Sequence, residues 1–249
     1  MTQRLALVTG GMGGIGTAVC RKLAAANGNT VVANCLPGYE HKDSWIAQMR
    51  KEGFDNIHAA EGDVADFVST SAMVRKIESD IGPVDILVNN AGIIRDNVLK
   101  KASDSDWMAV INSNLNSVFN VTKNVIDGMT ERGWGRVVNM SSVNGQKGQF
   151  GQTNYSAAKA GVHGFAKALA QEVIRKGVTV NSVSPGYVET SMVKSIRPDV
   201  LEKLIAGIPI GRLAKPEEIA SLVAFLASEE AGYITGANIA INGGMYMSG

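Results

Sequence analysis

The sequence predicts a doubly wound α/β fold, with a seven-stranded parallel sheet and helices on both of its faces. Short apolar runs alternate with longer segments of helical periodicity along the whole chain. The apolar runs are mostly continuous, which is typical of strands buried on both faces of a parallel sheet. The 249 residues contain no linker, repeat or low-complexity segment, so we expect residues 1–249 to form one domain.

Each element is predicted from its period and its residue types. Strands, which favour valine and isoleucine, are expected at Leu5–Val8, Thr30–Ala33, Asn56–Ala60, Ile86–Val88, Arg136–Met140, Thr179–Ser184 and Asn238–Ile241. Helices are expected near Gly16–Ala26, Asp43–Glu52, Val68–Asp80, Ser105–Arg132, Thr153–Arg175 and Pro216–Ala227. Strict alternation favours parallel pairing, because two parallel strands need a crossover between them.

Residues 189–213 depart from this alternation. The segment is helical in places, contains no strand, and is interrupted by Pro198 and Pro209. It follows a strand end, where open α/β sheets bind their ligands. We expect a substrate lid here, with an ordinary surface excursion as the alternative.

Composition excludes several classes of protein. Hydrophobic residues make up 45% and charged residues 19%, which excludes a disordered chain. The net charge of +1 gives no electrostatic reason to expect nucleic acid or a membrane as partner. The 28 glycines accompany only 6 prolines and lack a collagen period. Such an excess indicates tight turns, or a backbone that approaches a ligand closely.

Targeting and metal signals are absent from the pattern. Cys20 and Cys35 cannot form a disulfide framework, and the three histidines are scattered, so we expect no metal site. The apolar run near the N-terminus is shorter than the roughly 7 to 15 residues of a signal-peptide core. The longest apolar stretch, Ile219–Ala227, falls short of the ~20 residues of a membrane span. We therefore expect a soluble, cytoplasmic protein.

A glycine-rich turn joins the first predicted strand to an alanine-rich helix. A strand, a glycine turn and a helix start together hold a pyrophosphate, because backbone N–H groups and the helix dipole face the anion. The residues expected to contact it are Gly10, Met12, Gly13, Gly14, Ile15 and Gly16. The sequence therefore predicts a Rossmann-type dinucleotide site, and the alternative is a turn that serves only helix–strand packing.

The end of the second strand bears on which dinucleotide is bound. An acidic residue there would bind the ribose hydroxyls of NAD, but this strand ends in Asn34 and Cys35. Lys42, with or without His41, is suited to the extra phosphate of NADP, whereas Glu40 is a signal against it. The sequence favours NADPH, and the alternative for Lys42 is a solvated lysine at a helix start.

Ser142, Tyr155 and Lys159 have the spacing of a carbonyl-reducing site. Tyr155 and Lys159 lie four residues apart on a predicted helix, hence one turn apart on one face. A nearby ammonium favours a phenolate, so we expect Lys159 to lower the pKa of Tyr155. Ser142 would hold a carbonyl oxygen while Tyr155 delivers the proton. Taken singly, the three residues have structural alternatives: a turn cap, a helix-face residue and a surface charge.

Together these motifs resemble the short-chain dehydrogenase/reductase family along essentially the whole chain. The matching positions are Thr9-Gly10, Gly14-Ile15-Gly16, Asp63-Val64, Asn89-Asn90-Ala91-Gly92, Asn114, Ser142, Tyr155, Lys159 and Pro185-Gly186. The resemblance implies that Tyr155 is the acid–base, that Ser142 orients the carbonyl and that Lys159 also binds the nicotinamide ribose. It implies a water-linked proton relay at Asn114.

The resemblance also implies the remaining cofactor contacts and the assembly. Asp63 and Val64 would lie at the adenine, and Val188 and Thr190 at the nicotinamide carboxamide. The other implied contacts are Asn90, Ala91, Gly92, Pro185 and Gly186. Family members are commonly homotetramers, so a homotetramer is expected.

Within the family, the segment from Ser142 to Tyr155 resembles that of bacterial acetoacetyl-CoA reductases of polyhydroxybutyrate synthesis. This implies NADPH-dependent reduction of acetoacetyl-CoA to (R)-3-hydroxybutyryl-CoA. The implied substrate contacts are Gln149, Phe150, Gln152 and Tyr187, with Ser142 on the carbonyl and Asp96 near the entrance. The chain departs from those reductases at His41 and Lys42, where they carry arginine.

Two other functions remain open. A 3-oxoacyl-[acyl-carrier-protein] reductase would share the fold and chemistry but use a carrier-protein substrate. A non-catalytic dinucleotide sensor would have no need of a tyrosine tuned by a lysine.

Overall fold

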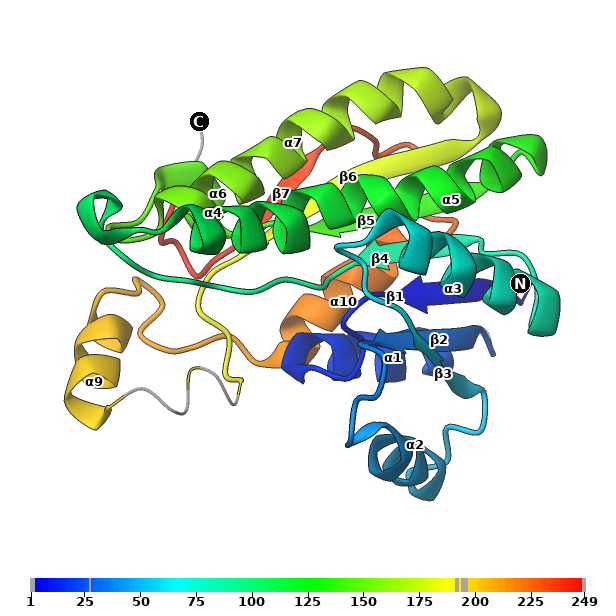
Figure 1. The fold of residues 1–249 in the computed structure, drawn as a ribbon, viewed down its shortest axis with the longest axis horizontal. Helices are drawn as coiled ribbons and strands as arrows, with labels where there is room; N and C mark the ends of the chain where they lie inside the picture. The colour runs from blue at the N-terminus through cyan, green and yellow to red at the C-terminus, as the bar shows by residue number, and fades with distance from the viewer. Residues whose placement is uncertain (1–2, 27, 191–192, 194–196, 248–249) are drawn as a thin grey trace.

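The computed structural model describes residues 3–26, 28–190, 193 and 197–247, which form a seven-stranded parallel sheet covered by helices on both faces (Figure 1). The strands are β1 (Leu5–Val8), β2 (Thr30–Cys35), β3 (Ile57–Glu61), β4 (Ile86–Asn89), β5 (Gly135–Met140), β6 (Val178–Pro185) and β7 (Asn238–Ile241). Their order is β3-β2-β1-β4-β5-β6-β7, and every pairing is parallel. The order reverses direction between β1 and β4, so the predicted doubly wound sheet is confirmed.

Alternate residues of β1 build two separate cores. Ala6 and Val8 belong to the core on one face, and Leu5 and Leu7 to the core on the other. The first face is covered by α1 (Gly14–Ala25), α10 (Pro216–Leu226) and α2 (Lys42–Lys51). The second is covered by α3 (Phe67–Asp80), α5 (Ser117–Glu131) and α7 (Thr153–Val173). Burial on both faces explains the continuous apolar runs of the strands.

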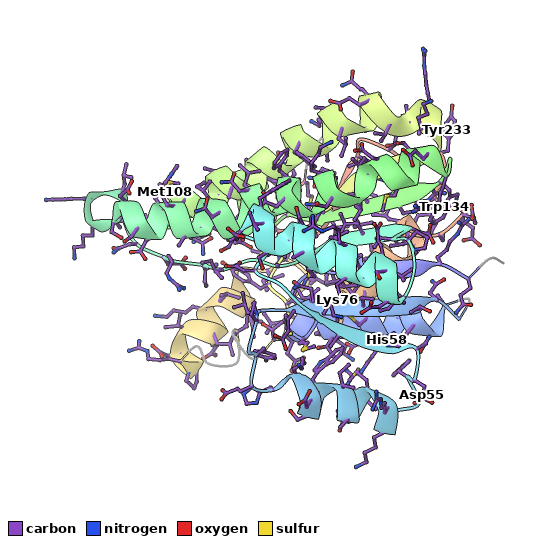
Figure 2. All side chains as sticks on the ribbon, turned by 45° about the vertical axis from the view of Figure 1, so that its right-hand side comes forward. Asp55, His58, Lys76, Met108, Trp134 and Tyr233 are labelled. Atoms are coloured by element: carbon purple, nitrogen blue, oxygen red, sulfur yellow. The ribbon has the colours of Figure 1, made fainter. Side chains whose placement is uncertain are left out.

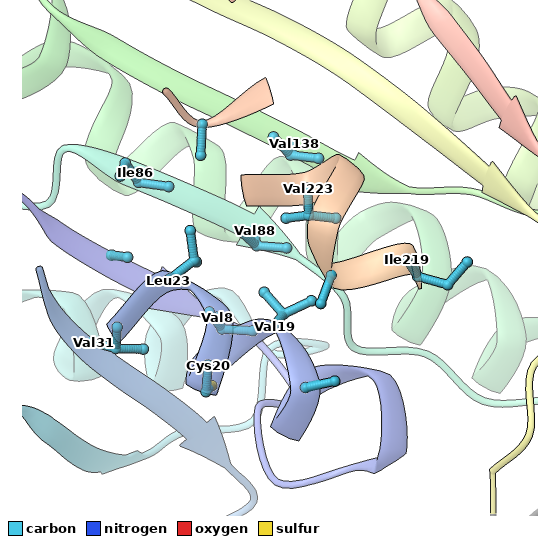
Figure 3. Packing of buried hydrophobic residues seen from close by; sticks show 14 of the residues in the cluster. Val8, Val19, Cys20, Leu23, Val31, Ile86, Val88, Val138, Ile219 and Val223 are labelled. Carbon is cyan, nitrogen blue, oxygen red and sulfur yellow. The ribbon is translucent and has the colours of Figure 1, made fainter. Parts of the chain in front are cut away.

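The core on the first face joins strands to two helices that are far apart in sequence. Val19 and Leu23 of α1 lie against Ile219 and Val223 of α10, above Val8 of β1 (Figure 3). All five side chains are essentially inaccessible to solvent. This packing holds the start of α1 at the carboxyl end of β1.

Helix starts follow local capping chemistry. The side chain of Asp66 accepts a hydrogen bond from the Ser69 N–H and begins α3, and Ser103 accepts one from Asp106 and begins α4 (Asp104–Ile111). α10 begins with Pro216, in a position where the missing N–H costs nothing.

The long helix predicted over Ser105–Arg132 is divided in the structure. A π-helical turn, Asn112–Asn116, separates α4 from α5. The Asn114 side chain donates one hydrogen bond to the Val110 carbonyl at 2.9 Å, so a side-chain amide competes for a helix carbonyl at this turn. The short helix α6 (Val143–Lys147) was not predicted.

Residues 189–213 are fixed at their base by a bridge between Val188 and Ala214. Pro198 was expected to interrupt this segment. In the structure it begins α9 (Pro198–Ala206), because proline is accommodated in a first turn. Residues 191–192 and 194–196 of the predicted lid lie outside the described residues, and the lid stays a prediction.

A polar cluster lies around Trp134 at the amino-terminal ends of β1 and β5, and Figure 2 marks the position of Trp134. Arg4 and Arg136 lie 3.9 and 4.5 Å from the centre of its ring, and its indole N–H donates to Glu229 at 3.0 Å. The opposite, carboxyl ends of the strands are the ones that remain open to a ligand. None of the helices among the described residues has the length and apolarity that a membrane crossing requires.

Candidate active site

A cavity of about 790 Å³ lies at the carboxyl ends of the strands, at the point where the strand order reverses. Most of the residues predicted for the site line it. They are Gly10, Met12, Gly13, Gly14, Ile15, Gly16, Asn90, Ala91, Gly92, Asp96, Asn114, Ser142, Gln149, Phe150, Gln152, Tyr155, Lys159, Pro185, Gly186, Tyr187, Val188 and Thr190. Lys42, Asp63 and Val64 lie outside this lining.

Gly10, Gly11, Gly14 and Gly16 of the turn leave no room for a side chain, whereas Gly13 is less confined. A Cβ atom on Gly11 would lie 2.8 Å from the Cα of Ala33, and one on Gly14 would lie 2.8 Å from Thr190. Gly10 has a φ of +58°, a left-handed conformation that glycine adopts without strain. α1 starts here, and the first-turn amides of a helix have no acceptor within the helix. The turn therefore fits a dinucleotide pyrophosphate.

Asn90 shapes this turn with its own amide. Its Nδ2 donates to the carbonyls of Thr9 and Gly10 at 3.0 and 3.1 Å. The backbone N–H groups of Asn90 and Ala91 donate to the Thr9 hydroxyl at 2.9 and 3.0 Å. Asn90 thus lines the cavity, but both N–H groups of its side-chain amide are engaged in hydrogen bonds that join the ends of β1 and β4.

Lys42 was predicted to meet the extra phosphate of NADP, but in the structure its ammonium is paired with a carboxylate. Its Nζ lies 2.6 Å from Oε1 of Glu61, the last residue of β3, and the other oxygen of Glu61 accepts the Gly38 N–H at 3.0 Å. The hydrogen bond and charge of Glu61 raise the pKa of Lys42. Sequence reasoning missed Glu61 because the carboxylate sits on the neighbouring strand, in register with Cys35.

The adenine contacts implied for Asp63 and Val64 also fall outside the lining. Asp63 Oδ1 instead accepts the Ala65 N–H at 2.9 Å, within the turn that follows β3. The cavity is lined here by Asn34, Cys35, Leu36 and Tyr39.

Ser142, Tyr155 and Lys159 come together at the inner part of the cavity. Ser142 caps α6, where its hydroxyl accepts the Asn144 N–H at 3.1 Å. Lys159 Nζ lies 5.6 Å from the centre of the Tyr155 ring and donates to the Met140 carbonyl at 2.8 Å. The predicted one-turn separation on α7 therefore brings the ammonium over the ring.

The Asn114 side chain also lies close to Lys159, because Gly92 is near both residues. A Cβ atom on Gly92 would collide with Oδ1 of Asn114 and lie 3.5 Å from Lys159 Nζ. Asn114 Nδ2 donates to the carbonyls of Ile93 and Val110, both at 2.9 Å. These bonds fix the amide so that its buried Oδ1 faces the lysine side of the cavity.

The pKa of Tyr155 departs from the prediction. Burial raises the pKa of this phenol, the Ser142 hydroxyl opposes that shift, and the charge of Asp96 adds to it. The expected lowering by Lys159 is wrong for this structure, because the ring is desolvated and Nζ points to the Met140 carbonyl rather than to the phenol oxygen. Burial also lowers the pKa of Lys159 to about 8.

The substrate side of the cavity is organised by a chain of amides. Gln152 Nε2 donates to both carboxylate oxygens of Asp96 at 3.0 Å, and its Oε1 accepts from Asn144 at 2.9 Å. Gln152 was predicted to offer its amide to the substrate, but the charged acceptor Asp96 takes those donors. Gln149 accepts from Lys147 at 2.9 Å, and the Phe150 side chain is exposed at the mouth.

Several lining residues were not predicted. They are Asn34, Cys35, Leu36, Tyr39, Ile93, Ile94, Met140, Ser141, Asn144, Val193 and Leu204. Asn144 lies within the segment from Ser142 to Tyr155, so its position in the sequence could have identified it. Val193 and Leu204 belong to residues 189–213 and bring that segment to the cavity, in support of the lid hypothesis.

We predict that Lys159→Met stabilises the protein near neutral pH. A pKa of about 8 in place of 10.5 corresponds to a cost of about 3 kcal/mol for burying the ammonium. This cost is complete below pH 8 and disappears as the pH rises towards 10.5, because the folded state releases the proton first. Losing the bond to Met140 costs about 1 kcal/mol, so the variant gains about 2 kcal/mol at pH 7.

The free energy of unfolding in urea, measured from pH 7 to 10.5, tests this prediction. The advantage of Lys159→Met over the wild type should shrink along that range. The control is Lys167→Met on the exposed side of α7, which should change stability by less than about 0.5 kcal/mol. Equal stability of Lys159→Met and the wild type at pH 7 would contradict the assigned cost.

Known proteins match this chain over nearly its whole length. The family model for short chain dehydrogenase matches residues 4–201. An acetoacetyl-CoA reductase of Cupriavidus necator is 62% identical over 99% of this chain and 100% of its own, and one of Allochromatium vinosum is 58% identical over 98% and 99%. A 3-oxoacyl-[acyl-carrier-protein] reductase of Vibrio harveyi is 44% identical over 98% of both chains. With its glycine turn and its Ser142, Tyr155 and Lys159 on one cavity, the chain belongs to the short-chain dehydrogenase family and binds a nicotinamide dinucleotide.

Proposed function

We propose that the protein is an NADPH-dependent reductase that converts acetoacetyl-CoA to (R)-3-hydroxybutyryl-CoA. The observation that carries the proposal is the convergence of Ser142, Tyr155 and Lys159 on the cavity that begins at the glycine turn. Similarity to two acetoacetyl-CoA reductases over nearly the full chain supports the choice of substrate. A homotetramer and a cytoplasmic location remain part of the proposal.

A nicotinamide dinucleotide supplies the hydride when it is bound. The glycine turn and the start of α1 would hold its pyrophosphate. Pro185, at the end of β6, and Gly186, Val188 and Thr190, which follow it, would bind the nicotinamide end, with Lys159 on the ribose. The same cavity then leaves the Ser142–Tyr155 side for the substrate.

The raised pKa of Tyr155 suits the direction of reduction. A phenol that keeps its proton at neutral pH can donate that proton to the oxygen of a carbonyl as the oxygen becomes negative. Ser142 is placed to donate a hydrogen bond to the same oxygen and to stabilise the developing charge. The phenolate that remains must be reprotonated before the next turnover.

Asn114 and Lys159 provide a route for returning the proton. The buried Oδ1 of Asn114 lies on the lysine side of the cavity, where it can accept a hydrogen bond from a water. Such a water would connect the buried lysine to solvent and reprotonate Tyr155 after each turnover.

The preference for coenzyme A over a carrier protein is tested by direct comparison. With NADPH, we expect kcat/KM to be higher for acetoacetyl-CoA than for acetoacetyl-[acyl-carrier protein]. The opposite order would support the carrier-protein reductase, which shares this catalytic chemistry. Binding of NADPH without turnover of either substrate would support a dinucleotide sensor. Chiral separation of the product checks the (R) configuration.

Tyr155→Phe should abolish reduction while leaving NADPH binding intact. The substitution removes the hydroxyl that donates the proton but keeps the ring, and general acid catalysis contributes about 10²- to 10⁴-fold. We expect kcat to fall by at least about 10²-fold, with an unchanged Kd for NADPH from its fluorescence. The matched control is Tyr233→Phe, at a fully exposed position. Retained turnover in Tyr155→Phe would exclude Tyr155 as the acid.

Glu61→Gln should strengthen the preference for NADPH over NADH. Glu61 neutralises Lys42, and releasing the lysine lets its charge meet the 2′-phosphate. Exposed ion pairs interact weakly, so KM for NADPH should fall by only about a few-fold while KM for NADH stays the same. Adding Lys42→Ala to Glu61→Gln should remove the gain.

The control for this prediction is Asp43→Asn. The Asp43 carboxylate lies 3.9 Å from the same ammonium and is almost fully exposed, so its loss should have little effect. An equal change in KM for both cofactors in Glu61→Gln would point instead to a disturbed loop at Gly38.

A further inference from the structure

A second cavity, of about 140 Å³, lies directly behind the substrate side of the main one. Its lining consists of Tyr187, Ile208, Ile210, Arg212, Ala214, Glu218, Ile241, Asn242 and Gly243. Among the described lining residues, Tyr187 alone belongs to both cavities. Tyr187 is therefore the residue at which the space proposed for the acetoacetyl group borders the second cavity.

The walls of the second cavity suit an apolar ligand. Isoleucines 208, 210 and 241 form much of the lining. The two charged residues satisfy each other, because Arg212 donates to both oxygens of Glu218 at 2.8 Å. The hydrogen bonds from Arg212 and from the Lys215 N–H lower the pKa of Glu218 to about 2, so the pair stays ionised and Arg212 is not free to bind an anion.

The walls are held in place by the backbone. The Ala214 N–H donates to the Tyr187 carbonyl at 2.9 Å, and the Ile210 N–H donates to the Gly243 carbonyl at 3.1 Å. Gly243 has a φ of +62°, and a Cβ atom there would lie 2.7 Å from Ile210. The chain end after β7 therefore packs tightly on the segment after α9, and the cavity is preformed.

Tyr187 is half-buried where the two cavities meet, and it is the residue that their linings share. Burial raises its pKa, and the charge of Asp96, which lines the main cavity, raises it further.

We propose that Tyr187 sets the length of the acyl chain that the enzyme accepts, and that the cavity behind it is a binding site for the alkyl tail of longer 3-oxoacyl thioesters. The inference rests on the proposed function for the identity of the short substrate. A water occupies about 30 Å³ in the liquid, so 140 Å³ holds roughly four or five groups of similar size, such as methylenes. Removing the ring would join the two spaces and admit the tail.

The test is Tyr187→Ala, assayed with 3-oxoacyl-CoA substrates of four, six and eight carbons. Burial of one methylene is worth about fourfold in affinity, so two added methylenes should raise the six- to four-carbon ratio of kcat/KM about 15-fold. The ratio is the measured quantity, because Tyr187 is itself predicted to contact the substrate. Tyr187→Phe keeps the ring and should keep the wild-type ratio.

A second variant shows where the tail binds. Ile208→Phe fills the cavity, and in the Tyr187→Ala background it should return the ratio to the wild-type value. Thermal unfolding of the Ile208→Phe single variant checks that it folds. An unchanged ratio in Tyr187→Ala, or a gain that persists when Ile208→Phe is added, would overturn the proposal.

Binding distinguishes this inference from the proposed function. The Kd values of butyryl-, hexanoyl- and octanoyl-CoA, measured by calorimetry, need no turnover. Tyr187→Ala should bind hexanoyl-CoA about 15-fold more tightly relative to butyryl-CoA than the wild type does. If the wild type fails to reduce acetoacetyl-CoA but this shift occurs, the proposed function falls and the cavity assignment stands.

Discussion

The hydrogen bonds that join the ends of β1 and β4 are the constraint on which the rest of the structure depends. The Thr9 hydroxyl accepts two backbone N–H groups from the turn after β4, and the Asn90 amide returns two bonds to the turn after β1. The backbones approach so closely that a Cβ atom on Gly10 would lie 3.0 Å from the Cα of Ala91. Parallel strands on either side of this seam send their helices to opposite faces, so a cavity must open above it. Gly10 is therefore a steric requirement of this seam as much as of the ligand.

Lys159 is a site residue whose ammonium is disfavoured by burial in the folded protein. Its ammonium is buried and donates a hydrogen bond to the Met140 carbonyl. The backbone around it is braced by Ser141, whose hydroxyl donates to the Lys159 carbonyl at 2.8 Å and contacts His163 at 2.7 Å. Such bracing holds a cation that its surroundings disfavour, because the two cores on either side of the sheet stabilise the protein as a whole. The same burial keeps Tyr155 protonated. One low-dielectric environment therefore raises the pKa of Tyr155 and lowers the pKa of Lys159.

Periodicity was sufficient for the seven strands and for the long helices other than Ser105–Arg132, which is divided at Asn112–Asn116, because burial on one or both faces leaves a regular pattern. It failed where the structure depends on contacts between segments. The Lys42–Glu61 pair depends on the register of β2 with β3, which places Glu61 beside Cys35. The engagement of Gln152 depends on Asp96, which lies 56 residues earlier in the chain. The site could be predicted as a set of residues, since local spacing places Tyr155 and Lys159 on one turn. The direction of the Tyr155 pKa shift could not, because it follows from burial by several segments.

Chemistry and selectivity come from different parts of this chain. Ser142, Tyr155 and Lys159 are held by β5 and α7, which pack within the sheet and its helical layers. Tyr187 and the second cavity are built by the segment beyond β6 and by the chain end, joined through single hydrogen bonds such as that from Ile210 to Gly243. Changes in these outer segments alter the space for an acyl group without moving the proton donor. Relatives of 62% and 44% identity are named as reductases of acetoacetyl-CoA and of 3-oxoacyl-[acyl-carrier-protein]. A fold divided in this way can keep one reaction and change its substrate through residues that never touch the reacting carbonyl.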